Sequence, residues 1–331
     1  MELKLKNIGM INEANVKIDG LTVIAGENDT GKSTVGKALY SSLNSIKDIT
    51  RSSIKEFDVY QSRFYVNYVS VFKKEPEAYC YMGLKLDGLL FDFYTDFDKV
   101  EKKKIPNIKE NNINDIIFIE TPLVWNFSKF FRDIALVESQ MNIEVDYPLF
   151  MKELNFKLFI KKASNGIDIR EKMISLMGGQ FEQDERGDFF FNKNGKRIEL
   201  ENTSTGIKQF GIFQVLSQNN YLNENTVLVL DEPEVHLHPK WQLEMAEVIV
   251  ELVKNGVKIV VNSHSPYMID ALKYYADKSK VNNNFYLAQK SEDETSTIND
   301  VTIDISPIFE KLTEPLEQLH RMKLGLSHDD K

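Results

Sequence analysis

Short apolar runs alternate along the chain with amphipathic stretches, a pattern typical of a fold that mixes strands and helices. Three runs, at 21–25, 227–230 and 257–261, are almost wholly apolar, as in strands buried on both faces of a parallel sheet. Stretches with helical period follow two of them, at 33–40 and 241–253. The order of strand, helix, strand and helix predicts an α/β fold with a central parallel sheet.

The two ends of the chain carry shorter patterns that predict further strands. Residues 2–10 alternate apolar and polar positions, and 14–18 predicts their antiparallel partner. Residues 60–98 also alternate and are rich in aromatic side chains, so we expect strands that face a core on one side. Late strands are expected at 285–288 and 301–304, followed by a charged C-terminal helix.

The middle of the chain has a different pattern. Residues 125–178 mostly follow helical spacing and predict a helical lobe. No heptad repeat is sustained there, so long coiled-coil arms are not expected. A β-hairpin is expected at 189–198, because Asn194-Gly195 favours a tight two-residue turn.

A glycine-containing loop joins the first buried strand to the helix after it. Two glycines let the backbone bend closely around phosphate oxygens, and a helix N-terminus favours an anion at the same place. Lys32 is placed to reach the β- and γ-phosphates of a nucleoside triphosphate, and the Ser33 hydroxyl to bind Mg²⁺. The alternative, a glycine turn with a chance lysine, is disfavoured by the flanking strand and helix. The expected phosphate-binding residues are Gly26, Glu27, Asn28, Asp29, Thr30, Gly31, Lys32, Ser33 and Thr34.

Two carboxylates follow the apolar strand at 227–230. Ligands of open α/β sheets bind beyond the carboxyl ends of the strands, so both residues lie where a nucleotide would bind. Asp231 is expected to hold Mg²⁺, directly or through water, and Glu232 to act as general base on the attacking water. An acidic turn after a strand is the alternative for these two residues taken alone. Together with the loop, they predict binding and hydrolysis of ATP with Mg²⁺.

The segments that end the last two buried strands resemble a known family. His264, in Ser263-His264-Ser265-Pro266, resembles the switch histidine of ATP-binding-cassette (ABC) ATPases, which implies contact with the γ-phosphate. The phrase Asp-Glu-Pro-Glu-Val-His-Leu-His-Pro at 231–239 resembles the AAA-like ABC ATPases of the SMC, RecF and OLD type. That branch serves genome maintenance and phage defence. The resemblance covers residues 1–45 and about 185–290.

The same branch carries a short Ser-x-Gly signature after a hairpin, and residues 202–209 match it. The resemblance implies that Ser204 and Gly206 contact the γ-phosphate bound to a second copy, so that a homodimer encloses two ATP molecules. A serine hydroxyl and a free N–H at a helix N-terminus suit a phosphate. Ser204 or Thr203 can also simply cap the following helix.

The sequence departs from the transporter members of the family. The string Leu-Ser-Gly-Gly-Gln does not occur in it, which disfavours an energy subunit of a membrane transporter. The family's glutamine that senses magnesium and water is also not evident. Its place stays open between Gln61 and Glu120, the second of which ends an apolar run.

The fractions of hydrophobic and charged residues are those of a typical globular protein. Of 331 residues, 42% are hydrophobic and 27% charged, and no apolar run is long enough to span a bilayer. The N-terminus lacks a signal-peptide pattern, and Cys80 is the single cysteine, so no intrachain disulfide can form. We therefore expect a cytoplasmic protein without a membrane partner.

The net charge of −9 argues against a broadly basic nucleic-acid binder. A local cluster of basic residues nevertheless leaves DNA as a possible partner, with a solvated protein face as the simpler interpretation. The cluster comprises Lys152, Lys157, Lys161, Lys162, Arg170 and Lys172, with Lys102 to Lys104 nearby in sequence.

Taken together, these features predict an α/β P-loop ABC-ATPase fold with an N-terminal antiparallel β-subdomain and an inserted, mostly helical lobe. The expected divisions are an N-terminal ATPase lobe at 1–122, the inserted lobe at 123–184 and a C-terminal ATPase lobe at 185–331. Family analogy implies an ATPase whose dimerisation regulates a separate effector, such as a nuclease or toxin, in bacterial anti-phage defence. The alternative is a RecF- or SMC-like ATPase that acts on DNA in repair or genome maintenance.

Overall fold

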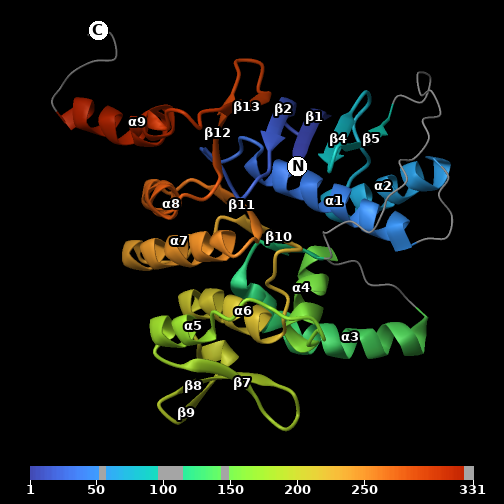
Figure 1. Ribbon diagram of the computed structural model, residues 1–331, viewed down its shortest axis with the longest axis vertical. Helices are drawn as coiled ribbons and strands as arrows, with labels where there is room; N and C mark the ends of the chain where they lie inside the picture. Colours follow the sequence, from blue (N-terminus) through green and yellow to red (C-terminus); the bar gives the residue numbers. More distant parts are fainter. Residues whose placement is uncertain (52–56, 96–114, 143–148, 324–331) are drawn as a thin grey trace.

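The computed structural model describes residues 1–51, 57–95, 115–142 and 149–323, and Figure 1 shows their arrangement. Among these residues, a ten-stranded sheet has the order β5-β4-β1-β2-β13-β12-β3-β11-β10-β6. Its strands are β1 (Glu2–Ile8), β2 (Ile11–Lys17), β3 (Leu21–Gly26), β4 (Tyr81–Leu86), β5 (Leu89–Tyr94), β6 (Asp115–Ile119), β10 (Thr226–Asp231), β11 (Lys258–Ser263), β12 (Asn283–Lys290) and β13 (Ser296–Asp300).

The centre of the sheet is parallel, as the apolar runs predict. β12, β3, β11, β10 and β6 are successive parallel neighbours. Every residue of β3 and β10 is buried, because helices cover both faces. The carboxyl ends of parallel strands meet at one edge, so the loop after β3 lies beside the carboxylates that end β10. The expected α/β fold is confirmed.

Two apolar cores lie on opposite faces of the sheet. On β10, Leu228 and Leu230 belong to one core, and Val227 and Val229 to the other. The first core is covered by α6 (Thr205–Gln218), α7 (Pro239–Lys254) and α8 (Pro266–Ser279), and the second by α1 (Lys32–Arg51) and α2 (Phe57–Phe72). Figure 1 shows α7 and α8 on the side of the sheet opposite α1 and α2.

The predicted N-terminal antiparallel pair is present and is joined to the central sheet. β1 pairs antiparallel with β2 and, on its other side, with β4 of the β4–β5 hairpin. β13 bridges the two parts, because it pairs with β2 in parallel and with β12 antiparallel. The antiparallel strands therefore continue the parallel sheet instead of forming a separate layer.

The expectation of strands throughout 60–98 is wrong in its first part. Phe57–Phe72 forms the helix α2, and only Tyr81–Leu86 and Leu89–Tyr94 are strands. Phe64, Tyr68 and Val71 are buried at spacings of four and three residues, which is the period of a helix. The aromatic content misled the prediction, because aromatic side chains favour strands only where the two-residue period is also present.

The last strand lies earlier than expected. β13 spans Ser296–Asp300, whereas the sequence analysis placed a strand at 301–304. Beyond Asp300 the chain still runs beside β12, since Val301 N donates to Phe285 O at 2.8 Å. The Thr302 hydroxyl then accepts from Phe285 N at 2.9 Å, so a side chain replaces the next backbone bond of the ladder. The expected C-terminal helix follows as α9 (Ser306–Lys323).

The region after β6 is mostly helical, as predicted, and ends in a small antiparallel sheet. The hairpin turns at Asn194-Gly195, where both residues have positive φ. The indole of Trp125 stacks on Phe181 with ring centroids 5.0 Å apart. Both side chains belong to the same apolar core as the buried residues of α6. Its elements are η2 (Pro122–Phe127), α3 (Ser128–Met141), α4 (Leu149–Phe159), α5 (Arg170–Met177), β7 (Gln180–Gln183), β8 (Phe189–Lys193), β9 (Lys196–Glu199) and η3 (Leu200–Asn202).

The division of the chain at 122/123 and 184/185 stays a prediction. The side chains of the expected insertion pack into the same apolar core as those of α6 and α7. In the described part of the chain, no helix combines the length and the apolar character needed to cross a membrane.

Candidate nucleotide-binding site

The loop between β3 and α1 has the backbone of a phosphate cradle. Gly26 and Gly31 have positive φ, and a Cβ at Gly26 would lie 2.5 Å from the backbone oxygen of Ala288. Only glycine therefore fits there. Thr30 Oγ1 donates to Glu27 O at 2.9 Å, which closes the loop on itself. Residues 31–34, at the start of α1, line the cavity in front of the loop, and a helix leaves its first N–H groups without an intrahelical partner.

Lys32 begins α1 and is nearly buried, with 5% of its surface exposed. Burial lowers the pKa of its ammonium, and the nearby carboxylates of Glu232 and Asp231 act in the opposite direction. Its Nζ donates to the backbone oxygen of Glu27 at 2.6 Å. A cation held at this depth by a neutral oxygen is suited to an anionic ligand.

Asp231 ends β10 and contacts the start of α1 across the sheet edge. Its Oδ1 accepts hydrogen bonds from Ser33 Oγ at 3.0 Å and from Asn262 Nδ2 at 2.8 Å. Burial raises the pKa of the Asp231 carboxyl, although both hydrogen bonds lower it. A buried carboxylate beside a serine hydroxyl is a set of hard oxygen donors, and its burial cost is relieved by a divalent cation. The residues present therefore fit Mg²⁺.

Glu232 and His264 face each other beyond the ends of β10 and β11. Glu232 adopts a left-handed backbone with φ +50°, and its N–H donates to Asn262 O at 2.9 Å. This conformation is uncommon for a residue other than glycine, and it turns the chain sharply after Asp231. His264 Nδ1 lies 3.1 Å from Glu232 Oε1, so the ring can donate a hydrogen bond to the carboxylate in the tautomer that carries its proton on Nδ1.

A buried glutamate, Glu234, holds the turn that carries His264. Oε1 of Glu234 accepts hydrogen bonds from Ser263 Oγ at 2.7 Å, His264 N at 2.9 Å and Ser265 N at 3.2 Å. Sequence reasoning did not single out Glu234. The available signal was its place in the family phrase, two residues after Glu232.

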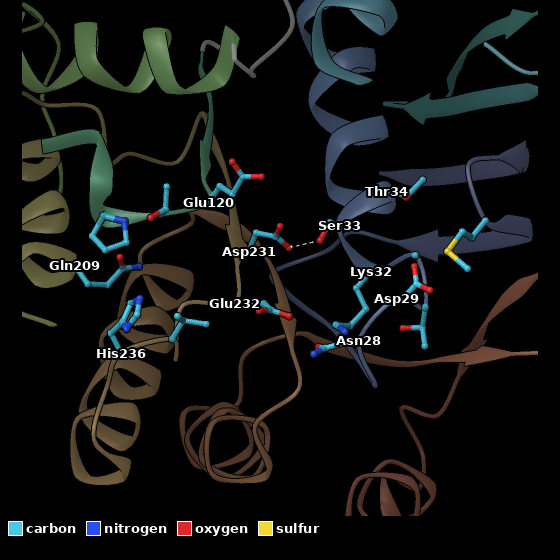
Figure 2. Close-up of a pocket in the computed structure, with 16 residues that line it drawn as sticks. Asn28, Asp29, Lys32, Ser33, Thr34, Glu120, Gln209, Asp231, Glu232 and His236 are labelled. Atoms are coloured by element: carbon cyan, nitrogen blue, oxygen red, sulfur yellow. Dashed lines mark hydrogen bonds between the residues drawn. The ribbon is translucent and has the colours of Figure 1, made fainter. Parts of the chain in front are cut away.

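Lys32, Ser33, Asp231 and Glu232 line a cavity of about 510 Å³, a size typical of small-ligand sites, whereas Glu234 and His264 are not among its lining residues. Figure 2 shows Lys32 and Ser33 on the side of α1, Asp231 and Glu232 in the middle, and Gln209 with His236 on the opposite side. The cavity is lined by Met10, Asn28, Asp29, Thr30, Gly31, Lys32, Ser33, Thr34, Glu120, Thr121, Pro122, Gln209, Asp231, Glu232, Val235 and His236.

Of the two candidates for the sensing residue, only Glu120 faces this cavity. Gln61 lies on α2, where its Nε2 donates to Asp92 O at 2.8 Å. Glu120 follows β6, and burial raises the pKa of its carboxyl, while Lys37, 3.8 Å away, lowers it. Gln209, on α6, also lines the cavity and was not proposed as a sensor from the sequence.

Ser204 and Gly206 lie outside the lining of the cavity. Ser204 is exposed and occupies the N-cap position of α6, but its side chain makes no capping hydrogen bond. Simple capping therefore does not account for its hydroxyl. Gly206 is buried against the ring of Trp241, where a Cβ would lie 2.9 Å from Cζ3.

The basic residues of the helical region are largely paired with carboxylates. Lys157 Nζ lies 3.3 Å from Glu153, and Lys172 Nζ lies 2.6 Å from Glu251. Such local pairing favours the interpretation of a solvated face over a DNA-binding stripe. Further pairs are Lys162 with Asp115 and Arg170 with Asp168, Lys161 is exposed, and Lys102 to Lys104 lie outside the described residues.

Comparison with known proteins places the chain in a class. The family described as "AAA domain, putative AbiEii toxin, Type IV TA system" matches residues 81–270, and the chain belongs to this family. The solved head of an SMC protein bound to the C-terminal winged-helix domain of ScpA has a TM-score of 0.51 at 14% identity, covering 92% of this chain and 98% of that one. The fold is therefore that of SMC-like ABC ATPases, as the sequence motifs predict.

One further solved structure and one characterised sequence are also similar to this chain. An Smc head with an extended coiled coil, bound to a ScpA domain from Pyrococcus furiosus, has a TM-score of 0.50 at 14% identity and covers 96% of this chain and 98% of its own. Among characterised sequences, the Septu protein PtuA of Bacillus thuringiensis is 23% identical over 310 residues, which are 82% of this chain and 72% of PtuA.

Proposed function

We propose that this protein binds ATP with Mg²⁺ and hydrolyses it, and that two copies close around two nucleotides to control a separate effector. The observation that carries the proposal is the convergence of Lys32, the Ser33–Asp231 pair and Glu232 on one cavity, in a chain whose fold is like that of an SMC head.

Binding depends on the loop and on Lys32. The cradle formed with Gly26 and Gly31 presents backbone N–H groups to the phosphates, and the Lys32 ammonium neutralises charge between the β and γ positions. Ser33 and Asp231 would hold Mg²⁺, which supplies further neutralisation of the triphosphate when bound.

Hydrolysis depends on the two groups beyond the strand ends. Glu232 is half-buried and orients the attacking water as general base. His264, 3.1 Å from Glu232, keeps this carboxylate in place and would contact the γ-phosphate. Catalysis consists of positioning and charge neutralisation, without a covalent enzyme intermediate.

The test is a Glu232→Gln substitution, which preserves shape and removes the base. Steady-state turnover should fall by about 10²- to 10⁴-fold while ATP binding is retained. Glu224→Gln is the matched control, since Glu224 is exposed near the opposite end of the same strand. Unchanged turnover in Glu232→Gln would remove Glu232 from this role.

The proposed dimer gives the exposed Ser204 hydroxyl a function. Ser204 lies outside its own cavity and makes no capping bond, so it is free to contact a γ-phosphate held by a second copy. ATP would then join the two copies and hydrolysis would release them. Light scattering of Glu232→Gln protein with and without ATP tests this step, and a monomer under both conditions contradicts it.

The proposed setting is a cytoplasmic bacterial defence system in which the effector is a nuclease or toxin. The likeness to Septu protein PtuA and a family description that includes a toxin–antitoxin system support it. Tagged Glu232→Gln protein, recovered from its native host in the presence of ATP, should retain a stoichiometric nuclease or toxin. Recovery of chromosomal DNA with repair proteins alone would contradict this setting.

A further inference from the structure

Gln209 is a buried amide that lacks a hydrogen-bond partner for its oxygen. The residue lies in the second turn of α6 and is 4% exposed. Among the described residues, nothing donates a hydrogen bond to its Oε1. The side chain lines the nucleotide cavity, and Figure 2 shows it beside His236, across the cavity from Lys32. A buried amide oxygen without a partner is unfavourable, which indicates that a ligand bonds to it.

Gln214 on the same helix shows how a buried glutamine is normally satisfied. Its Oε1 accepts from Phe181 N at 2.9 Å, and its Nε2 donates to Phe181 O at 3.0 Å. Both glutamines are buried on α6, yet only Gln214 is bonded on both sides within the protein. The difference indicates that the partner of Gln209 lies in the cavity.

The surroundings define what this partner is. The acidic residues that line the cavity are Asp29, Glu120, Asp231 and Glu232, and an ionised carboxylate can only accept hydrogen bonds. The oxygens of a triphosphate also only accept. The Gln209 oxygen therefore requires a donor that also bonds to acceptors around it, and water has this chemistry.

We propose that Gln209 is a positioning residue for the nucleotide-bound state, in which its amide holds a water molecule between the γ-phosphate end of ATP and the cavity wall formed by Glu120. This inference rests on the proposed function, because it assigns a residue to the same cavity. It adds that the orientation of α6, which begins directly after Ser204, depends on whether the cavity of the same chain holds a nucleotide.

Hydrogen bonds between α6 and η2 explain how binding in the cavity can affect the orientation of α6. α6 begins at Thr205, four residues before Gln209 and directly after the exposed Ser204. Trp125 Nε1 donates to Lys208 O at 2.9 Å, and Lys208 Nζ donates to Asn126 Oδ1 at 2.7 Å. These bonds join α6 to η2, which starts two residues after Glu120. A water held by Gln209 and Glu120 would therefore fix both walls of the cavity and orient the first turn of α6.

The test compares Gln209→Met with Gln214→Met by thermal unfolding, without ligand and with ATP and Mg²⁺. Without ligand, Gln209→Met should melt at the wild-type temperature or about 2–4 °C above it, because the unpaired amide is removed. The shift in Tm produced by ATP and Mg²⁺ should fall to less than half, and turnover should fall about tenfold. Gln214→Met should melt below wild type without ligand, yet keep the wild-type shift.

A purely structural role for Gln209 predicts the reverse. If Gln209→Met melts well below wild type, or fails to fold, or keeps the full shift with ATP and Mg²⁺, the assignment is wrong. Wild-type protein that shows no shift with ATP and Mg²⁺ would overturn the proposed function itself, and with it this inference. A wild-type shift that Gln209→Met reproduces would overturn the role of Gln209 alone.

Discussion

At the scale of single residues, Glu234 combines a stabilising and a destabilising contribution. Its Oε1 accepts three hydrogen bonds from the turn at 263–265, while its Oε2 is buried without a partner. Burial raises the pKa of this carboxyl above its ordinary value. A carboxyl with a raised folded-state pKa stabilises the fold least at high pH, because its ionised form is the one that burial disfavours.

Substitutions at Glu234 should separate these two contributions. Glu234→Ala leaves a hydroxyl and two backbone N–H groups without an acceptor and should cost about 2–4 kcal/mol of unfolding free energy. Glu234→Gln keeps the accepting oxygen and removes the charge, so it should change stability by less than about 1 kcal/mol at neutral pH. Urea denaturation measures both values.

The pH dependence provides the check on Glu234. The stability of Glu234→Gln relative to wild type should rise from about pH 5 to about pH 8, since only the wild type must ionise a buried carboxyl. Equal losses in the Ala and Gln variants, with no trend in pH, would contradict the hydrogen-bonding role.

The sequence predicts the residues of the site that belong to short contiguous motifs. Lys32, Ser33, Asp231 and Glu232 are recognisable because each follows a buried strand whose end must lie at one sheet edge. Gln209 is not predicted from the sequence in this way, because its proposed role depends on which face of α6 lines the cavity. Only the packed structure reveals that relation.

At the scale of elements, α1 packs closely against the sheet at Gly36. A Cβ there would lie 2.8 Å from Val229 Cγ1 and 3.2 Å from Asn262 Nδ2. Asn262 donates to Asp231, so packing of the helix and geometry of the carboxylate proposed to bind Mg²⁺ are linked. The central strands were predictable because their apolar runs are continuous. The helix α2 was not predictable, because aromatic residues at other spacings obscure the helical spacing of the buried Phe64 and Tyr68.

Gly36→Ala tests this close approach. Alanine favours a helix over glycine by about 1 kcal/mol, but overpacking against Val229 costs about 1–3 kcal/mol. The net result should be a loss of stability and a weaker stabilisation by ATP with Mg²⁺, measured by thermal unfolding. Thr50→Ala is the control on the last turn of α1, where the hydroxyl donates only to Ile46 O within the helix. A Gly36→Ala protein as stable as wild type would contradict this prediction, because it would mean that β10 moves to accommodate the methyl group at little cost in free energy.

At the scale of the whole molecule, the phosphate loop is held by residues distant in sequence. Lys290 Nζ lies 2.7 Å from Asp29, and Lys311 Nζ lies 3.6 Å from Glu27, so β12 and α9 both contact it. Ser204, in contrast, lies outside the cavity of its own chain. The proposed active unit therefore has two faces per copy, one formed by the loop and one by the start of α6, which meet only between copies.

Mixing two inactive variants tests whether the site is shared between copies. Lys32→Ala removes the ammonium proposed to bind the phosphates, and Ser204→Glu places a negative charge where the partner's γ-phosphate would lie, so each variant alone should be inactive. A mixed dimer has one site in which an intact loop faces an intact Ser204. An equimolar mixture should therefore recover up to about a quarter of wild-type turnover, since about half of the dimers are mixed and each has one working site. Turnover is measured as phosphate release against total protein, with each variant mixed with itself as the control. If Ser204 acts within its own chain, no mixed dimer contains an intact site and activity stays absent at every ratio.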